Sequence, residues 1–494
     1  MKIIRCALCL CLCLCFCCLL CTGCGSDYQD AILYYELPDK PETLDPQIAS
    51  SDAECSLVRN IFEGLLRKNA QGTVVPGAAE QYEKNGAVYT FHLRDNLIWS
   101  DQQPLTAADF VFGLRRALDP KTKAPFAFRL FCIENAEKIH AGKADLSTLG
   151  VSAPDDRTVV IRLAYEDAYF ENTLTTSVAM PCREDFFNNA AGKYGLESEF
   201  ILSNGSYRLT KWNKESFGIR LYKNMGYQGD FPAKNAAVYV TKDEKKSAFD
   251  RLADNNVDIA FFDVSLDDEA KKQGLKTVQF ENICWMLTIG SDFSERLRQS
   301  LAMLVGGEAF AANLPAGYRM ADSLYPAILS DAAAGEGSTL YNPEEARRIF
   351  SEEINRLPEK KFPSGIKLRY ESSETIKPVV TDLVGHWQNK LGAFVNIDAV
   401  KPGELSDQLT GQTLPIAFFP VTARNGNCAE YLRHFGYTQN HADPAQAQKD
   451  LLKSTHLIPV VFAKTEIGFS AALNEVFIEP ENGYIDFSMI VKKG

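Results

Sequence analysis

Residues 89–120 read YTFHLRDNLIWSDQQPLTAADFVFGLRRALDP, and this stretch contains both kinds of secondary structure on which the fold depends. Apolar and polar residues alternate over residues 89–94, a pattern that predicts a half-buried strand. Thr106 and Asp109 have the spacing of a capping box at the start of a helix, and Pro120 marks the end of that helix. A strand followed by an amphipathic helix predicts mixed α/β architecture.

Strands and helices alternate in the rest of the chain as well. The spacing of leucine and isoleucine predicts a helix over residues 56–66. Asn342 and Pro343 are typical of the first positions of a second helix. Gly392 is typical of a helix end, and apolar residues alternate over 395–399 in the strand that is expected next. No internal repeat and no long low-complexity linker interrupts this pattern.

Composition narrows the class of protein. The chain has 494 residues, of which 46% are hydrophobic and 23% are charged, and its formal charge is −12. These values are typical of a folded, soluble protein and exclude collagen-like, disordered and multi-spanning membrane proteins. The length is sufficient for two or three lobes with full cores. The acidic balance argues against a general nucleic-acid binder, because such a protein needs a basic face.

The amino terminus predicts export. Nine of the 14 cysteines lie in the first 24 residues. Lys2 and Arg5 precede an uncharged apolar stretch over residues 7–20, which has the length of a signal-peptide core and is too short to span a bilayer. Small residues directly before Cys24 resemble the bacterial lipobox, from which the chain departs at Cys21, where leucine is commoner. An unlipidated secretory signal is the alternative.

The lipobox reading makes residues 1–23 a signal peptide and residues 24–30 a lipid anchor and tether. Cleavage removes Lys2 and Arg5, so the mature chain carries 50 basic and 64 acidic side chains, a formal charge of −14. It would lie outside the cytoplasmic membrane, where disulfides form. Five cysteines remain besides Cys24, so at least one of their thiols stays unpaired.

Sequence signatures of catalysis are missing. The chain has no phosphate-binding GxxxxGK[ST], no HExxH, no GxSxG and, after residue 24, no paired CxxC zinc ribbon. A loose group of Cys428, His434 and His441 does not match the spacing of a zinc module. The prediction is a protein that is not an enzyme and that holds no metal and no cofactor.

A series of segments resembles one known family. The chain is similar to the extracytoplasmic solute-binding proteins of oligopeptide and dipeptide ABC importers, known as family 5. The resemblance covers nearly the whole mature chain. It is carried, besides the stretch 89–120, by LDPQ (44–47), NIFEGLLR (60–67), VPGAAE (75–80), SNGSY (203–207), FSERLR (293–298), IPVV (458–461) and SMIV (488–491).

The resemblance implies a two-lobed periplasmic-binding-protein-like fold of type II, with an extra small domain and a hinge between the lobes. Lobe I would comprise residues 31–69, 178–283 and 466–494. The small extra domain would comprise residues 70–177, and lobe II would comprise residues 284–465. Closure of the lobes over a ligand is the motion expected of such a fold.

The resemblance also implies a function. The chain is expected to be a lipid-anchored monomeric receptor that captures peptides outside the cytoplasmic membrane and delivers them to an ABC permease. One alternative is the same fold with a non-peptide ligand, such as an anionic metabolite or a nickel chelate. Further alternatives are a sensor or adhesion lipoprotein without a transport role and, with least support, a secreted hydrolase.

In this family an aspartate after a strand of lobe II anchors the ligand's amino group, and here two alignments stay open. A gap-free alignment places Arg424 at that position, where a cation would repel an amine and could grip a carboxylate. A short insertion instead places Glu430 there and keeps an acidic anchor. The second alignment implies a disulfide between Cys284 and Cys428 and is slightly favoured. Either charged residue could also be a solvated loop residue.

Three further residues are candidate ligand contacts by resemblance. Ser51 and Asp52 lie in a loop that approaches the cleft in this family. Trp285 follows Cys284 where the chain crosses between the lobes, so its ring could line a pocket or belong to the core.

Overall fold

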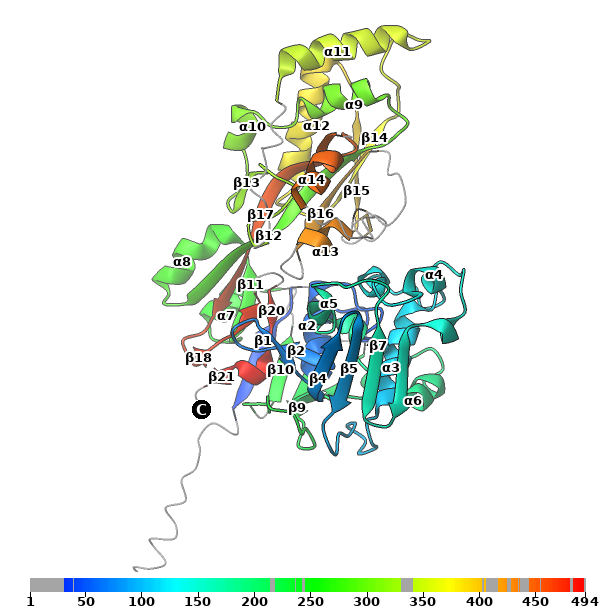
Figure 1. The fold of residues 1–494 in the computed structure, drawn as a ribbon. Coiled ribbons are helices and arrows are strands. Elements are labelled where there is room, and N and C mark those ends of the chain that lie inside the picture. The colour runs from blue at the N-terminus through cyan, green and yellow to red at the C-terminus, as the bar shows by residue number, and fades with distance from the viewer. Residues whose placement is uncertain are drawn as a thin grey trace, which may run out of the picture.

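The computed structural model describes residues 31–38, 40–213, 218–235, 237–241, 245–329, 341–401, 404–405, 416–423, 428–433, 435, 444–453, 455–479 and 483–492. The described chain forms two lobes that are joined by long strands (Figure 1). The lower lobe contains both ends of the described chain, and the upper lobe contains the segment between the joining strands.

One sheet runs through both lobes. Its eleven strands follow the order β15-β14-β16-β12-β17-β11-β1-β10-β9-β8, and β13 pairs with β17 beside this path. The lower-lobe strands are β1 (Ile32–Glu36), β8 (Tyr207–Lys211), β9 (Ile219–Lys223), β10 (Ala237–Thr241) and β11 (Ile259–Phe262). The upper-lobe strands are β13 (Tyr318–Met320), β14 (Lys367–Glu371), β15 (Asn396–Val400) and β16 (Ile416–Thr422).

The lobes are joined by β12 (Lys276–Ile289) and β17 (Leu457–Phe469), which are 14 and 13 residues long. A strand of this length extends roughly 45 Å. The two strands pair antiparallel along their length, with β-bulges between Glu281 and Ile283 and between Trp285 and Met286. Because bulges bend and twist a strand, the crossing region is where the lobes can change their angle. The predicted domain limits at 283/284 and 465/466 fall inside these two strands, and we keep 284–465 as the proposed extent of lobe II.

The small domain adds a second, four-stranded antiparallel sheet in the order β4-β5-β7-β6. The strand predicted over 89–94 is β5 (Val88–Leu93), and the helix predicted after Thr106 is α3 (Ala107–Leu118), so both predictions are confirmed. The buried apolar residues of the small domain join those of the lower lobe in one core. The other elements of this region are β4 (Ala79–Asn85), β6 (Val151–Asp155), β7 (Thr158–Arg162) and α4 (Ala136–His140).

The helix predicted over 56–66 is displaced toward the amino end. α2 (Asp52–Ile61) begins earlier because Ser51 caps it, and it ends earlier because the Ile61 carbonyl accepts the N–H groups of Asn204 and Gly205, at 3.2 and 3.0 Å. Leu66 instead begins β2 (Leu66–Lys68), which pairs with β3 (Val74–Pro76). A contact between segments far apart in the sequence therefore overrides the local helical spacing.

The remaining lower-lobe elements flank the sheet and carry the last part of the chain. The helices are α5 (Phe170–Thr173), α6 (Glu184–Asn189), α7 (Ala248–Ala253) and α8 (Asp267–Lys272). The short strands are β18 (Leu473–Glu475), β19 (Ile478–Glu479), β20 (Tyr484–Ile485) and β21 (Val491–Lys492).

Helices cover the upper part of the sheet and enclose separate hydrophobic cores. The helix predicted at Asn342 is α11, whose N-cap is Asn342, and the helix predicted to end at Gly392 is α12, after which Gly392 adopts φ 71°. The helices of this lobe are α9 (Glu295–Ala302), α10 (Glu308–Ala312), α11 (Pro343–Arg356), α12 (Lys377–Leu391), α13 (Cys428–Arg433) and α14 (Pro444–Lys453). Within the described residues, every helix is too short or too polar to cross a membrane.

Candidate functional site

A cavity of about 180 Å³ lies where the joining strands leave the lower lobe. It brings together the end of β1, the first turns of α2, both joining strands and the start of β20. Its lining residues are Tyr35, Pro38, Asp52, Ala53, Ser56, Phe261, Asn282, Thr465, Gly483 and Tyr484. A larger groove of about 550 Å³ lies between α10 and α12, where no joining strand contributes to its lining. Of these two, the first alone is lined by residues of the strands that join the lobes, Asn282 and Thr465, so its shape depends on the angle between them.

The two joining strands meet at the cavity through a polar contact. Asn282 occupies the bulge of β12 between Glu281 and Ile283. Its Oδ1 accepts a hydrogen bond from Thr465 Oγ1 at 3.0 Å, and only 2% of the residue is exposed. The Asn282 carbonyl also accepts the N–H of Ala423 at 2.8 Å, so the chain that follows β16 begins beside this cavity. Sequence reasoning missed both Asn282 and Thr465, although an asparagine within a long apolar strand is a usable signal of a bulge.

Capping interactions hold the start of α2 in place. Ser51 accepts the N–H of Glu54 through Oγ at 3.2 Å. Glu54 in turn accepts the N–H groups of Glu42 and Thr43 through Oε1, and those of Ser50 and Ser51 through Oε2. The structure thus gives the Ser51 hydroxyl a role as helix cap. Asp52, the other predicted contact in this loop, lines the cavity.

Trp285 lies in the core of the upper lobe. Its ring stacks on that of Phe418, with centroids 5.4 Å apart, and 7% of the residue is exposed. The sequence left open whether Trp285 lines a pocket or packs in the core, and the structure places it in the core. A direct ligand contact of Trp285 stays a prediction.

The structure describes the two candidate amine anchors, Arg424 and Glu430, only in part. Arg424 and the predicted lipid site Cys24 lie outside the described residues. Glu430 lies in α13, and its side chain is outside the described part of the chain.

Cys284 and Cys428 are buried thiols in one hydrophobic cluster, and burial raises the pKa of the Cys284 thiol well above its usual value. Their pairing as a disulfide stays a prediction.

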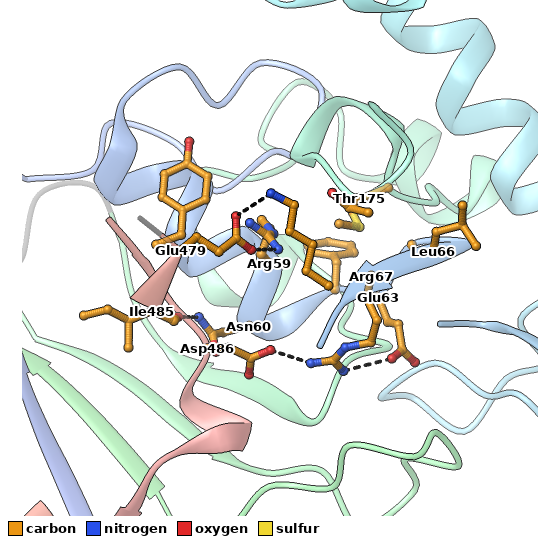
Figure 2. A pocket seen from close by; sticks show the side chains of 14 residues that line it. Arg59, Asn60, Glu63, Leu66, Arg67, Thr175, Glu479, Ile485 and Asp486 are labelled. Carbon is orange, nitrogen blue, oxygen red and sulfur yellow. Dashed lines mark hydrogen bonds and ion pairs between the residues drawn. The ribbon is translucent and has the colours of Figure 1, made fainter. Parts of the chain in front are cut away.

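Ion pairs fill a second crevice, next to α2 (Figure 2). Glu479 pairs with Arg59 and, at 3.5 Å, with Lys68. Arg67 pairs with Asp486 and, at 3.1 Å, with Glu63. The space left is about 20 Å³, which is room for about one water molecule. These pairs fasten the last strands to α2 and β2, and we assign them a structural role.

Two adjacent carboxyl groups, Glu466 of β17 and Asp267 of α8, lie on the side of the joining strands turned away from the cavity. Glu466 pairs with Gln279 in the ladder, whereas its neighbour Thr465 faces the cavity, so Glu466 points to the opposite side. Only 1% of Glu466 is exposed. Asp267 lies next to it and accepts hydrogen bonds from Thr277 Oγ1 at 2.9 Å and from Lys271 Nζ at 2.6 Å. Burial, and then the adjacent Asp267 carboxylate, raise the pKa of Glu466 to about 7.

This arrangement predicts a pH-dependent stability. Because folding raises the pKa of Glu466, its contribution to stability is complete below the unfolded-state pKa and is lost as the pH rises through about 7. Glu466→Gln, which mimics the protonated acid, should therefore reduce the fall in melting temperature between about pH 5 and about pH 8. Glu281→Gln, on the same face of the joining strands, keeps Glu466 and should show the same fall in melting temperature as the unmodified protein. An equal fall in Glu466→Gln and in the unmodified protein would contradict the assignment.

The chain matches the sequence model of one known family over most of its length. The model of the family described as "Bacterial extracellular solute-binding proteins, family 5 Middle" matches residues 73–443, well over half of the chain. The chain belongs to this family. It is therefore a solute-binding protein of a family whose members act outside the cytoplasm, as the sequence motifs predicted.

Two periplasmic binding proteins resemble the chain over most of its length. The probable deoxycholate-binding periplasmic protein YgiS of Escherichia coli is 29% identical over 386 residues, which are 74% of this chain and 70% of YgiS. The periplasmic oligopeptide-binding protein OppA of Salmonella typhimurium is 28% identical over 408 residues, which are 79% of this chain and 73% of OppA.

A solved structure confirms the fold. The murein tripeptide binding protein MppA of Escherichia coli superposes with a TM-score of 0.82 at 23% identity, over 94% of this chain and 99% of MppA. The predicted two-lobed, periplasmic-binding-protein-like α/β fold is therefore confirmed. Groups of three or more metal-ligating side chains are absent from the described residues.

Proposed function

We propose that this family 5 protein captures peptides outside the cytoplasmic membrane and delivers them to an ABC permease. The observation that carries the proposal is the cavity at the crossing of β12 and β17, because two of its lining residues, Asn282 and Thr465, belong to strands shared by both lobes. The names of OppA and MppA, which refer to oligopeptides and to a murein tripeptide, support a peptide as the ligand.

Hinge closure is the proposed mechanism. A ligand that contacts both lobes favours the closed arrangement by its differential affinity for that state. Rotation about the two bulges in the β12–β17 pair would then bury the ligand and present a surface formed by both lobes to the permease. Main-chain hydrogen bonds to an extended peptide would supply affinity with little dependence on the peptide's sequence.

The location of the protein is part of the proposal. We infer that residues 1–23 are removed, that Cys24 carries lipid and that the mature monomer stays at the outer face of the cytoplasmic membrane. The apolar stretch before Cys24 supports this, as do the periplasmic relatives. A sensor lipoprotein without a transport role is the alternative.

A non-peptide ligand is the second candidate, and one observation favours it. The gap-free alignment places Arg424 at the amine-anchor position, and Tyr431 and Leu432 follow a few residues later in the chain. Those two residues are buried in α13, with 2% and 1% exposed. An arginine at that position suits a carboxylate, and YgiS is named for deoxycholate, a carboxylate-bearing steroid. In the other alignment Glu430 keeps the acidic role, and a peptide amine is the expected partner.

Native mass spectrometry of the purified mature protein tests the two candidates together. Short peptides that co-purify, or that bind from a mixed tripeptide library, would support the peptide proposal. Loss of these adducts in Glu430→Ala but not in Arg424→Ala would assign the amine anchor to Glu430, and the reverse loss would assign a ligand contact to Arg424. Binding of deoxycholate with no binding of any peptide would overturn the peptide proposal.

A further inference from the structure

One segment of the lower lobe is basic although the chain as a whole is acidic. Residues 206–236, which include β8 and β9, contain six basic and two acidic side chains, whereas the whole chain has 52 basic and 64 acidic ones. Asp230, one of the two acidic residues, pairs with Arg94 at 2.6 Å. The side chains of the adjoining segments add no net charge, because the two aspartates of residues 25–31 offset the two lysines of residues 491–494. A positive patch therefore remains.

Arginines of this segment lie on the outer face of the sheet. Arg208 and Arg220 are exposed, whereas Leu209 and Leu221 beside them are buried. Successive side chains of a strand point to opposite faces, so the two arginines share the solvent face of β8 and β9. Lys223 follows at the end of β9 and is partly exposed. No ion pair of the described residues includes Arg208, Arg220 or Lys223.

Tyrosine rings lie among these cations. Tyr222 is the ladder partner of Arg208, and Tyr239 is the ladder partner of Arg220. The two tyrosine hydroxyls are 3.1 Å apart, and the Arg220 guanidinium lies 5.0 Å from the centroid of the Tyr239 ring. The ring of Tyr34 meets that of Tyr239 edge to face, with centroids 5.7 Å apart. Tyrosine is enriched where a membrane meets water, because its ring is apolar and its hydroxyl stays hydrated.

A fixed turn after β9 presents a large apolar side chain to solvent. Met225 is 84% exposed. Asn224, directly before it, is 8% exposed; its N–H donates to the Ser206 carbonyl and its Nδ2 donates to the Gly205 carbonyl, both at 2.9 Å. These bonds hold the turn against the start of β8, so Met225 is kept outward beside Lys223. An apolar side chain next to basic ones suits the boundary between lipid head groups and acyl chains.

The patch is close to the place where the chain enters the lobe. Ile32 pairs with Ala237, Ala237 with Tyr222, and Tyr222 with Arg208, so the four residues form one row across β1, β10, β9 and β8. Strands lie about 4.8 Å apart, which places Arg208 roughly 15 Å from Ile32. Cys24 precedes Ile32 by eight residues, a length that can span at most about 28 Å. Figure 1 shows β9, β10 and the start of β1 at the lower end of the lower lobe. A lipid on Cys24 would keep this row within reach of the membrane.

From this combination we propose that the basic face, formed by Arg208, Arg220, Lys223 and Met225, rests on an anionic lipid surface, the membrane in which Cys24 is anchored. The inference rests on the proposed location of the protein and adds an orientation to it. The anchor holds the face at a high effective concentration near the lipid, so a weak electrostatic attraction is sufficient. The contact would restrict the orientation of the receptor before it meets the permease.

Hydrogen exchange of the vesicle-bound protein tests the proposal. The five cysteines after residue 24 are buried, so a maleimide lipid can couple the mature chain to vesicles through Cys24. Exchange is compared on neutral phosphatidylcholine and on an equal mixture of phosphatidylcholine and phosphatidylglycerol. Amides of residues 219–227 should exchange about 5- to 10-fold more slowly on the anionic vesicles, whereas α12 should not change. Raising the salt concentration should remove the difference, because salt screens surface charges.

Charge-matched variants locate the contact. The combined change Arg208→Gln, Arg220→Gln and Lys223→Gln should give equal exchange on both kinds of vesicle. The control changes Lys121, Lys138 and Lys143 to Gln; these exposed residues of the small domain are equal in charge, so the slowing should persist. Met225→Ser should keep only part of the slowing, since it removes the apolar contact and leaves the charges. Thermal unfolding shows that each variant is folded.

The outcomes separate this inference from the proposed function. Equal exchange of the unmodified protein on neutral and anionic vesicles would overturn the membrane contact, as would slowing that survives in the folded triple variant of the basic face. Peptide binding, measured on the same samples, should be unchanged in that variant, so either result leaves peptide capture in place. Mass spectrometry of the native mature protein tests the anchor itself: a Cys24 without lipid would overturn the proposed location and the inference with it.

Discussion

Replacing Glu479 with alanine is expected to lower the free energy of unfolding by about 3–5 kcal/mol, because the change removes a buried carboxylate that pairs with two cations, Arg59 and Lys68. The Glu479 side chain is 4% exposed, and its partners Arg59 and Lys68 are 15% and 5% exposed. Removing one member of a buried ion pair costs more than the pair contributes, since the remaining charge stays desolvated. Urea unfolding followed by circular dichroism measures the change.

An exposed pair serves as the matched control. Glu344 is 83% exposed and pairs with Arg347 of the same helix at 3.1 Å. Glu344→Ala should change the free energy of unfolding by no more than about 0.5 kcal/mol. Glu479→Gln should fall between the two alanine variants, because it keeps a hydrogen-bond acceptor. If Glu479→Ala proves as stable as Glu344→Ala, the crevice of Figure 2 does not hold the last strands in place.

Trp387→Ala is expected to destabilise the upper lobe by about 3–5 kcal/mol. Trp387 is fully buried in the core of that lobe, and its Nε1 donates to the Leu301 carbonyl at 2.9 Å. The substitution leaves a large void and removes one of the hydrogen bonds that the Leu301 carbonyl accepts. Because the upper and lower cores are separate, hydrogen exchange should accelerate in α9 and α12 and stay slow in α3.

The reciprocal substitution is the control. Phe110 is fully buried in α3 and belongs to the lower core, so Phe110→Ala should accelerate exchange in α3 and spare α12. Both variants are compared by hydrogen-exchange mass spectrometry. Equal acceleration in both lobes for either variant would mean that the two cores unfold as one cooperative unit.

Local rules were enough to predict several elements. The capping pattern at Thr106 and Asp109 predicts α3, and Asn342 with Pro343 predicts the start of α11. In each case the signal and the structure lie within a few residues: Asn342 Oδ1 accepts the N–H of Glu345 at 3.1 Å. The family resemblance extended these local predictions to the two-lobed arrangement.

Contacts between distant segments explain what sequence reasoning missed. α2 ends at Ile61 because residues near 204 take over its last carbonyl. Asn60 Nδ2 donates to the Ile485 carbonyl at 2.7 Å across a sequence separation of 425 residues. Neither partner carries a local pattern that identifies the other, so the crevice beside α2 could not be predicted.

The candidate site was predicted in part. Asp52 lines the hinge cavity, while Ser51 caps a helix and Trp285 packs in a core. Trp285 illustrates the difficulty, because a tryptophan at a lobe crossing is equally compatible with a pocket wall and with a core. The anchoring roles of Arg424 and Glu430 depend on side chains outside the described residues, and they stay predictions.

The position of β17 in the sheet has a consequence for how a nascent chain acquires its structure. β17 lies between β12 and β11, and its residues Ile458, Val460 and Val461 belong to the upper core while Ile467 and Phe469 belong to the lower one. Neither lobe is complete until this late strand has been synthesised. A partly made chain would therefore lack the strand that the two cores share, and neither part of the large sheet could be completed until near the end of synthesis.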